Sequence, residues 1–438
     1  MQRRVFIETY GCQMNEADTE LMFGLLRHQG WSVAVSADEA DVVLLNTCAV
    51  RERAEERVFG RLGWLKSLKA RRPDVLLGVT GCMAERMRGD IVRRAPYVDL
   101  VIGPDAYRRL PDLVAQAQAE GDHEPFIDVR LDRQETYDDA QLDRVVGVSG
   151  WITVQRGCDK FCSFCIVPFV RGRERSLPPA EVVRQAREMA EQGFREVTLL
   201  GQTVSSYYER GHDFADLLRA VHEVEGLHRI RYTSPYPNDF SDRLLETLGA
   251  LPRVGRHIHL PVQSGSTRVL RDMRRGYTIE SYEALIARVR ALLPDFALTT
   301  DIIVGYPSET EAEFEATLDL MRRVRFDAAF MFRYSEREGT LASRTRPDDV
   351  PDAVKRERLQ RLIGVQEQIS KERYATLVGH EVEVLIHAPG KRDPEQMLGR
   401  TSCFRNTILP RGPYAAGDLV RARVIGATSH TLFAEATA

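Results

Sequence analysis

The sequence has no apolar run that approaches the ~20 residues of a membrane-spanning helix. Near its start, Glu8 interrupts the chain before an apolar segment of useful length can develop, so no signal peptide is predicted. The net charge is only -3 over 438 residues, so any RNA binding must come from local basic patches. From these absences we expect a cytoplasmic protein with no membrane partner.

Cysteine is also scarce, and three of the 7 cysteines stand close together. Without an export signal, a disulfide framework is disfavoured, and metal binding or catalysis in a reducing cytosol is favoured. Cys158, Cys162 and Cys165 have the spacing Cys-x3-Cys-x2-Cys, with Phe164 before the third. Structural zinc prefers four ligands, and nothing adjacent supplies a fourth, whereas an iron–sulfur cubane on three cysteines leaves one iron open. A structural zinc site or plain buried cysteines remain the alternative.

Residues 1–140 alternate short apolar runs with helical patterns, which predicts a doubly wound parallel sheet. Three of these runs lead into Cys12, Cys48 and Cys82. The carboxyl ends of parallel strands lie on one edge of the sheet, where ligands bind, so we expect a second three-thiolate site there. The alternative is that cysteine is simply a common buried residue. The polar, acidic stretch Pro125–Gly147 is predicted to be a linker.

Residues 145–375 contain six apolar runs with helical patterns between them. The runs are Trp151–Gln155, Val197–Gly201, Ile230–Ser234, His257–Val262, Leu298–Val304 and Ala328–Tyr334. Six β-α units fall short of the eight of a closed barrel, so we predict an incomplete (β/α)6 barrel with a side opening for a macromolecule. Cys158 follows the first run, which places that site on the carboxyl face. A long charged helix from Val350 to about Tyr374 is predicted to be a connector.

Residues 376–438 change to an alternating pattern of five short strands, which predicts a small closed β-barrel. Such barrels often bind oligonucleotides. Its basic residues are Lys391, Arg392, Arg400, Arg405, Arg411, Arg421 and Arg423. They could form an RNA-binding face or only a solvated surface. Arg51–Arg72 is a second basic stretch with the same two interpretations.

Several motifs together carry a resemblance over nearly the whole chain. They are Tyr10–Asn15, Asn46–Arg61, Gln155–Cys165, Arg171–Arg175, His259–Ser266 and Thr300–Gly305. The chain resembles the radical S-adenosylmethionine (SAM) methylthiotransferase family, with an amino-terminal cluster domain, a radical SAM barrel and a carboxyl-terminal TRAM domain. Gln13-Met14 makes it most similar to the members that modify tRNA. The stretches Gln202–Ser205 and Ser234–Pro237 depart from the usual family pattern.

The resemblance implies two 4Fe–4S clusters and SAM as cofactors. Cys158, Cys162 and Cys165 would hold the catalytic cluster that binds and cleaves SAM, and Cys12, Cys48 and Cys82 would hold a second cluster that carries sulfur. The SAM pocket would include Phe164, Gly201, Gln202, Asp301 and Gly305.

The resemblance also implies a substrate and partners. The product would be 2-methylthio-N6-(dimethylallyl)adenosine 3′ of a tRNA anticodon. The partners would be tRNA, an external electron donor and a sulfur source, and the chain would be a monomer. The alternatives are a sister enzyme acting on another tRNA adenosine or on a ribosomal protein, and a zinc-containing RNA-binding protein.

Overall fold

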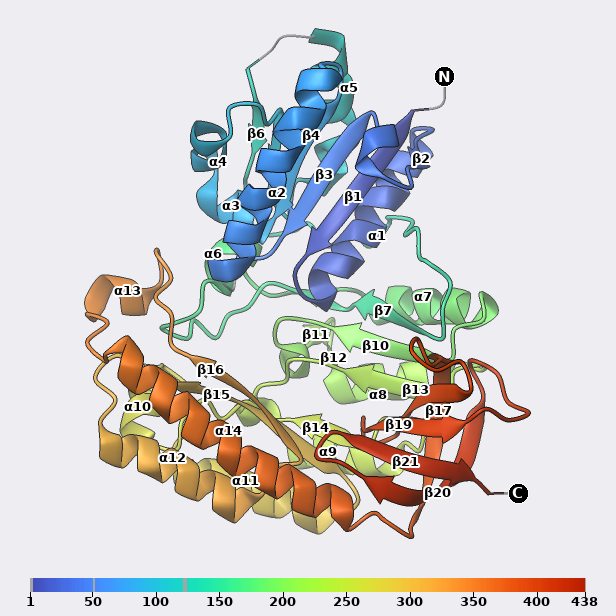
Figure 1. Cartoon of the computed structure of the whole chain (residues 1–438), viewed down its shortest axis with the longest axis vertical. Coiled ribbons are helices and arrows are strands. Elements are labelled where there is room, and N and C mark those ends of the chain that lie inside the picture. The colour runs from blue at the N-terminus through green and yellow to red at the C-terminus, as the bar shows by residue number, and fades with distance from the viewer. Residues whose placement is uncertain (1–2, 50–51, 121–123, 438) are drawn as a thin grey trace.

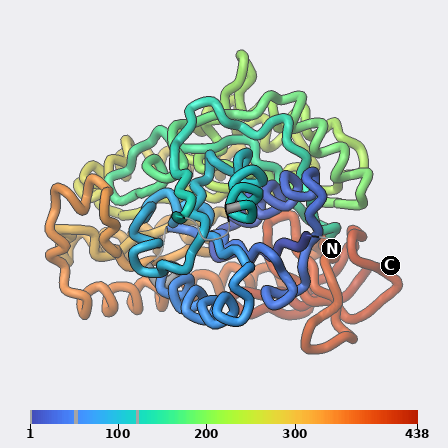
Figure 2. Tube along the Cα trace, turned by 90° about the horizontal axis from the view of Figure 1, so that it is seen from above, coloured from blue at the N-terminus to red at the C-terminus, as the bar shows by residue number. Residues whose placement is uncertain are grey.

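The computed structural model describes residues 3–49, 52–120 and 124–437. The amino-terminal domain lies above the partial barrel in Figure 1, and the small carboxyl-terminal barrel lies beside the partial barrel. Seen from above, the small barrel lies to one side of the amino-terminal domain (Figure 2). No helix in the described part of the chain is long and apolar enough to cross a membrane.

The amino-terminal domain is a six-stranded parallel sheet with the order β2-β1-β3-β4-β5-β6. The strands are β1 (Arg4–Tyr10), β2 (Ser32–Val33), β3 (Val42–Thr47), β4 (Leu76–Gly81), β5 (Leu100–Ile102) and β6 (Phe126–Asp128). The helices are α1 (Gln13–His28), α2 (Glu52–Arg71), α3 (Cys82–Met87), α4 (Gly89–Arg94) and α5 (Leu110–Glu120).

Both faces of this sheet are covered by helices, as a doubly wound sheet requires. Along β3, Val42 and Leu44 pack in the core with α1 and α5. Their neighbours Val43 and Leu45 pack in the core with α2, α3 and α4. The predicted doubly wound sheet is therefore confirmed.

The stretch predicted to be a linker is instead packed on the amino-terminal domain. Its first residues form β6, which pairs with β5. Further on, Tyr137 is buried and donates its hydroxyl to the Pro104 carbonyl at 2.9 Å. The many acidic residues suggested an exposed linker, but Arg108 binds Glu135 and Asp139 and holds the segment in place.

The central domain is built on six parallel strands in two three-stranded sheets, β13-β10-β7 and β14-β15-β16. The strands are β7 (Ser149–Thr153), β10 (Glu196–Leu200), β13 (Arg229–Tyr232), β14 (His257–His259), β15 (Ala297–Val304) and β16 (Ala328–Arg333). One apolar core contains residues of both sheets, among them Leu199 and Ile302. The predicted six-stranded partial barrel is confirmed.

The helices of the central domain are α6 (Val167–Arg171), α7 (Pro179–Glu191), α8 (Phe214–His222), α9 (Asp242–Ala250), α10 (Thr267–Asp272), α11 (Ile279–Leu292), α12 (Glu311–Val324), α13 (Leu341–Thr345) and the connector α14 (Asp352–Ala375). Most of them cover the outside of the strands, whereas α6 lies against α3 of the amino-terminal domain (Figure 1). Two short antiparallel strand pairs complete the domain, β8 (Gln155–Arg156) with β9 (Arg175–Ser176) and β11 (Tyr208–Glu209) with β12 (His212–Asp213).

The carboxyl-terminal domain is a closed barrel with the order β17-β18-β19-β21-β20. Its strands are β17 (Glu381–Pro389), β18 (Gln396–Thr401), β19 (Asn406–Pro410), β20 (Leu419–Ala427) and β21 (Thr431–Ala436). The five predicted strands are confirmed.

The small barrel is docked against β13 of the partial barrel through buried arginines. Arg229 donates to the carbonyl of Arg400 at 2.8 Å, and Arg231 donates to that of Thr401 at 2.9 Å. Arg231 is also bound to Glu196 at 2.6 Å. Since an arginine left without partners in a protein interior is strongly destabilising, these contacts tie the two barrels together.

Candidate functional site

All six cysteines of the two predicted sites line one cavity of about 380 Å³. We call Cys12, Cys48 and Cys82 the amino-terminal triplet, and Cys158, Cys162 and Cys165 the barrel triplet. The amino-terminal triplet lies at the carboxyl edge of the upper sheet. The barrel triplet follows the first strand of the partial barrel. The structure thus brings two separately folded cysteine groups to one place.

Three adjacent strands position the amino-terminal triplet. Cys12 precedes α1 as its N-cap, Cys48 follows β3, and Cys82 begins α3. Because β1, β3 and β4 are neighbours in register, their carboxyl ends meet. Gly81 has a φ of 91°, which a residue with a side chain rarely adopts, and a Cβ there would press on the Thr47 carbonyl.

The thiols of this triplet differ in their electrostatic surroundings. A hydrogen bond from Cys48 and the positive charge of Arg171 lower the pKa of Cys12 to about 6, against the opposing effect of burial. Burial raises the pKa of Cys82 above its ordinary value, although Arg171 opposes the shift. Arg171 Nε donates to Cys82 Sγ at 3.0 Å. Thus a single buried guanidinium stabilises negative charge on this group.

The barrel triplet lies on a tightly folded loop. Cys158 N donates to the Gly172 carbonyl at 3.1 Å, and Cys165 N donates to the Cys162 carbonyl at 3.0 Å. Gly157 has a φ of 77°, and a Cβ there would collide with the Arg173 carbonyl. The tight turn therefore requires glycine immediately before the first cysteine.

Side chains from other elements contact the barrel triplet. Arg275 Nη1 donates to Cys162 Sγ at 3.2 Å, and Thr203 Oγ1 lies 3.1 Å from Cys158 Sγ. Burial raises the pKa of Cys165 to about 12. Since iron binds the thiolate, metal binding must displace the Cys165 proton.

Four of the five residues predicted for the SAM pocket line the cavity: Phe164, Gly201, Gln202 and Asp301. Gly305 is not among its lining residues. Its amide donates to Glu309 at 2.7 Å, and a Cβ at its φ of 71° would collide with Lys355 of α14. The connector helix therefore accounts for this glycine. The predicted assignment of the SAM pocket stays a prediction.

Two buried amide oxygens in the cavity wall fit a ligand rich in donors. Gln202 Oε1 and Gln263 Oε1 are buried, and neither has a hydrogen-bond partner in the described part of the chain. Buried polar atoms are normally paired. SAM carries an ammonium group, ribose hydroxyls and an adenine amino group, so its donors match these acceptors.

We predict that Gln202→Leu weakens SAM binding roughly two- to tenfold, because one hydrogen bond contributes roughly 0.5–1.5 kcal/mol. Gln366→Leu is the matched control, since Gln366 also has a buried Oε1 without a partner but lies on α14, outside the cavity lining. Equilibrium SAM binding to anaerobically reconstituted protein would measure the effect. Equal losses in both variants would contradict a role for Gln202 in the pocket.

Sequence reasoning missed several polar residues of the site. Arg171, His259 and Lys160 stood inside motifs but were given no role at the cysteine sites, and Arg275 and Thr203 were not singled out. His259 Nε2 lies 3.3 Å from Asp301 Oδ2, and Lys160 binds Asp239 at 2.9 Å. Their only signal was a polar residue near a strand end or a cysteine.

Within the described ranges, no three His, Cys, Asp or Glu side chains gather closely enough to hold a single metal ion. The fit to larger iron–sulfur groups rests instead on the shared cavity and on the two arginines that contact Cys82 and Cys162.

Two family models match separate parts of the chain. The model of the uncharacterized protein family UPF0004 matches residues 4–103, and that of the Radical SAM superfamily matches residues 152–321. A solved structure of the radical S-adenosylmethionine methyltransferase TsrM from Kitasatospora setae has a TM-score of 0.56 and 16% identity, covering 78% of this chain and 77% of that one. At this identity the likeness shows the fold alone.

Two curated relatives cover almost the full length. A tRNA-2-methylthio-N(6)-dimethylallyladenosine synthase of Phocaeicola vulgatus is 45% identical, with 99% of this chain and 96% of the relative covered. The protein of the same name from Moorella thermoacetica is 46% identical, with 99% and 98% covered.

The fold and the matched models define a radical SAM enzyme with an added amino-terminal sheet domain. Such enzymes use SAM and a 4Fe–4S cluster. At the identity and coverage of its relatives, the chain belongs to the tRNA-2-methylthio-N(6)-dimethylallyladenosine synthase family.

Proposed function

We propose that this chain methylthiolates C2 of the dimethylallylated adenosine that lies 3′ of the anticodon in tRNA. The barrel triplet would hold the SAM-cleaving 4Fe–4S cluster, and the amino-terminal triplet would hold a second cluster that carries sulfur. The observation that carries the proposal is that both triplets line one cavity. Carbon activation and sulfur delivery can therefore take place on a single bound base.

The chemistry explains why side chains alone are insufficient. When bound, the barrel cluster supplies the electron that cleaves SAM to an adenosyl radical, which can break the unactivated C2–H bond. The chain's own residues prepare the site. Arg275 is buried and donates to Cys162, and hydrogen bonds to cluster sulfurs tune reduction potential. An external electron donor and a sulfur source are also needed.

Apolar residues of the cavity shield the reacting atoms from water. Met14 and Leu200 pack together between the two domains, and both line the cavity with Pro261. Exclusion of water prevents side reactions of a reactive intermediate. Lys160 also lines the cavity, over the Tyr236 ring at 4.8 Å from its centroid, where its charge is paired with Asp239 at 2.9 Å.

The test in cells is direct. We expect tRNA from a strain that lacks this chain to contain N6-(dimethylallyl)adenosine in place of its 2-methylthio derivative. Returning the wild-type chain should restore the derivative, and returning the barrel-triplet alanine variant should not. Mass spectrometry of tRNA nucleosides measures this. Unchanged nucleosides in the strain that lacks the chain would contradict the proposal.

Several basic residues considered for tRNA binding are already ion-paired within the protein. Arg171 and Arg175 are buried in ion pairs with Asp18 and Asp105, so they do not form an RNA-binding surface. In the second basic stretch, Arg51 and the side chains of residues 52–54 lie outside the described residues. Several other basic side chains of this stretch are ion-paired. The pairs are Arg61 with Glu8, Lys69 with Asp99, Arg71 with Asp38 and Arg72 with Asp41.

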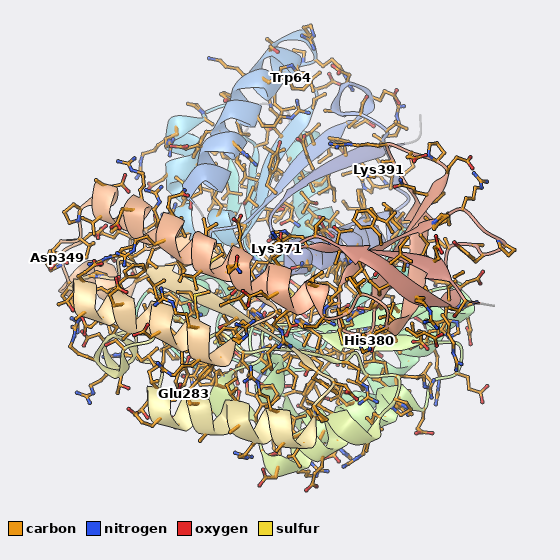
Figure 3. All side chains as sticks on the ribbon, turned by 60° about the horizontal axis from the view of Figure 1, so that its bottom comes forward. Trp64, Glu283, Asp349, Lys371, His380 and Lys391 are labelled. Carbon is orange, nitrogen blue, oxygen red and sulfur yellow. The ribbon has the colours of Figure 1, made fainter. Side chains whose placement is uncertain are left out.

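The small barrel remains the better candidate for the tRNA-binding surface, although some of its basic residues are already paired within the protein. Arg405 is bound to Asp327 at 2.6 Å and serves domain docking, and Arg423 pairs with Glu381 at 3.3 Å. Lys391 and Arg392 are exposed. Figure 3 shows Lys391 in the small barrel and Glu283 on α11, away from it.

We predict that Lys391→Ser with Arg392→Ser weakens tRNA binding and lowers its salt slope by roughly 0.7–0.9 per lost phosphate contact. The control is Arg322→Ser with Arg323→Ser on α12, where Arg323 binds Glu283 at 2.9 Å. Point variants are preferable to deleting the small barrel, which would strip Arg229 and Arg231 of their partners. Equal salt slopes in the two double variants would contradict the prediction.

A further inference from the structure

One arginine connects the barrel loop to the amino-terminal triplet. Arg171 ends α6, six residues after Cys165, and its side chain is 4% exposed. It reaches across the domain boundary, donates from Nε to Cys82 Sγ at 3.0 Å, and places Nη1 at 2.7 Å from Asp18 Oδ2. Arg171 also lines the shared cavity. The loop that carries the barrel triplet therefore also supplies the cation beside the amino-terminal triplet.

The hydrogen-bonding capacity of this arginine is only partly used. Nη1 is paired with Asp18 at 2.7 Å, but the buried Nη2 has no hydrogen-bond partner within the described residues. A buried guanidinium normally pairs all its donors, because unpaired ones are costly. An acceptor for Nη2 is thus missing at a residue that lines the shared cavity.

The charges around Arg171 indicate that this acceptor is an anion. Asp18 is fully buried and is shared between Arg171 and Arg156, the second at 3.0 Å. Tyr107 donates its hydroxyl to the same carboxylate at 3.4 Å. Two guanidinium groups share this one carboxylate, so Asp18 alone balances only one of their two positive charges. A buried charge needs a partner of the opposite sign.

We propose that Arg171 binds an anionic sulfur species, of the hydrosulfide or methylthiolate class, in the part of the cavity lined by the amino-terminal triplet. This inference rests on the proposed second cluster, whose three thiolates leave one iron open for such a ligand. Nη2, which has no acceptor within the described residues, would donate to the sulfur ligand. Arg171 would thus hold the sulfur that is transferred.

A purely structural role predicts something different. Arg171 could serve only to join the two domains through Asp18. Arg156 tests this, because it is equally buried and makes the same kind of ion pair with Asp18. Within the described residues it makes no hydrogen bond to any of the six cysteines, and it does not line the cavity that they share. Arg156→Met is therefore the matched control for Arg171→Met.

The experiment uses the full chain in which the barrel triplet is replaced by alanine, so that only the second cluster can assemble. Sodium hydrosulfide is titrated into the reduced, reconstituted protein, and the shift of the EPR spectrum gives a dissociation constant. A charge-assisted hydrogen bond contributes about 1.5–3 kcal/mol, so Arg171→Met is expected to weaken binding about 10- to 100-fold. Arg156→Met should bind as the parent does.

Equal dissociation constants for Arg171→Met and the parent, or equal losses in Arg171→Met and Arg156→Met, would overturn the inference. Should Arg171→Met lose the cluster, Arg171→Lys decides. That variant keeps the charge but not the fork of donors, and unweakened hydrosulfide binding in it would also overturn the inference. Iron analysis of the parent distinguishes a failure of this inference from a failure of the proposed function. A parent without iron would show that the amino-terminal triplet does not hold the proposed second cluster.

Discussion

Alanine substitution of the whole amino-terminal triplet is expected to end methylthio transfer while reductive SAM cleavage continues. The reason is spatial: the barrel triplet has its own loop, hydrogen bonds and arginine, none of which depends on Cys12, Cys48 or Cys82. The variant should retain about half of the iron of the wild-type protein. The readouts are 5′-deoxyadenosine and methylthiolated nucleoside from one anaerobic reaction.

Alanine substitution of the barrel triplet should give the opposite pattern. It is expected to abolish 5′-deoxyadenosine formation, and therefore product, while a similar share of iron remains on the amino-terminal triplet. Circular dichroism checks that both variants are folded. If the amino-terminal variant is folded, keeps its barrel cluster and yet cleaves no SAM, the two triplets do not have separate tasks.

The enzyme is expected to be selective for tRNA over ribosomal proteins. Offered dimethylallylated tRNA and ribosomal proteins side by side, the reconstituted enzyme should add the mass of a methylthio group to the tRNA alone. Family membership and the Gln13-Met14 pair beside Cys12 favour the nucleic acid. Gln13 and Met14 line the cavity, so they are placed to contact the substrate. A modified ribosomal protein with unmodified tRNA would refute this choice.

The cysteine positions were predictable because they depend on a topological rule. Apolar runs reveal parallel strands, and parallel strands end on one edge, so residues just after β1, β3 and β4 had to come close together. The same rule placed Cys158 on the carboxyl face of the partial barrel. That the two edges face each other across one cavity could not be predicted, because it depends on how the domains pack.

The ion pairs between the domains could not be predicted for the same reason. Asp18 lies within α1, where an acidic residue is usually on a solvated face. Its burial is explained only by the ion pairs with Arg156 and Arg171, which belong to the central domain. Arg229 and Arg231 occupy β13, but their partners belong to the small barrel. Sequence spacing carries no information on such contacts between domains.

Gly305 shows the limit of assigning roles from strand ends. It follows β15 at the end of the motif Thr300–Gly305, which contains the cavity residue Asp301, so a ligand contact was a reasonable prediction. In the structure its backbone conformation and the approach of Lys355 are sufficient to require glycine. The relevant neighbour is more than forty positions away, on α14, and no local pattern indicates it.

The central claim is that the two triplets hold two clusters at one cavity, and EPR of the fully reduced wild-type protein tests it most directly. The comparison is with the summed spectra of the two triple-alanine variants, each carrying one cluster. We expect a spin–spin interaction between nearby clusters, so the wild-type spectrum should be broader than the sum and differ from it in shape. A wild-type spectrum equal to the sum would contradict the claim.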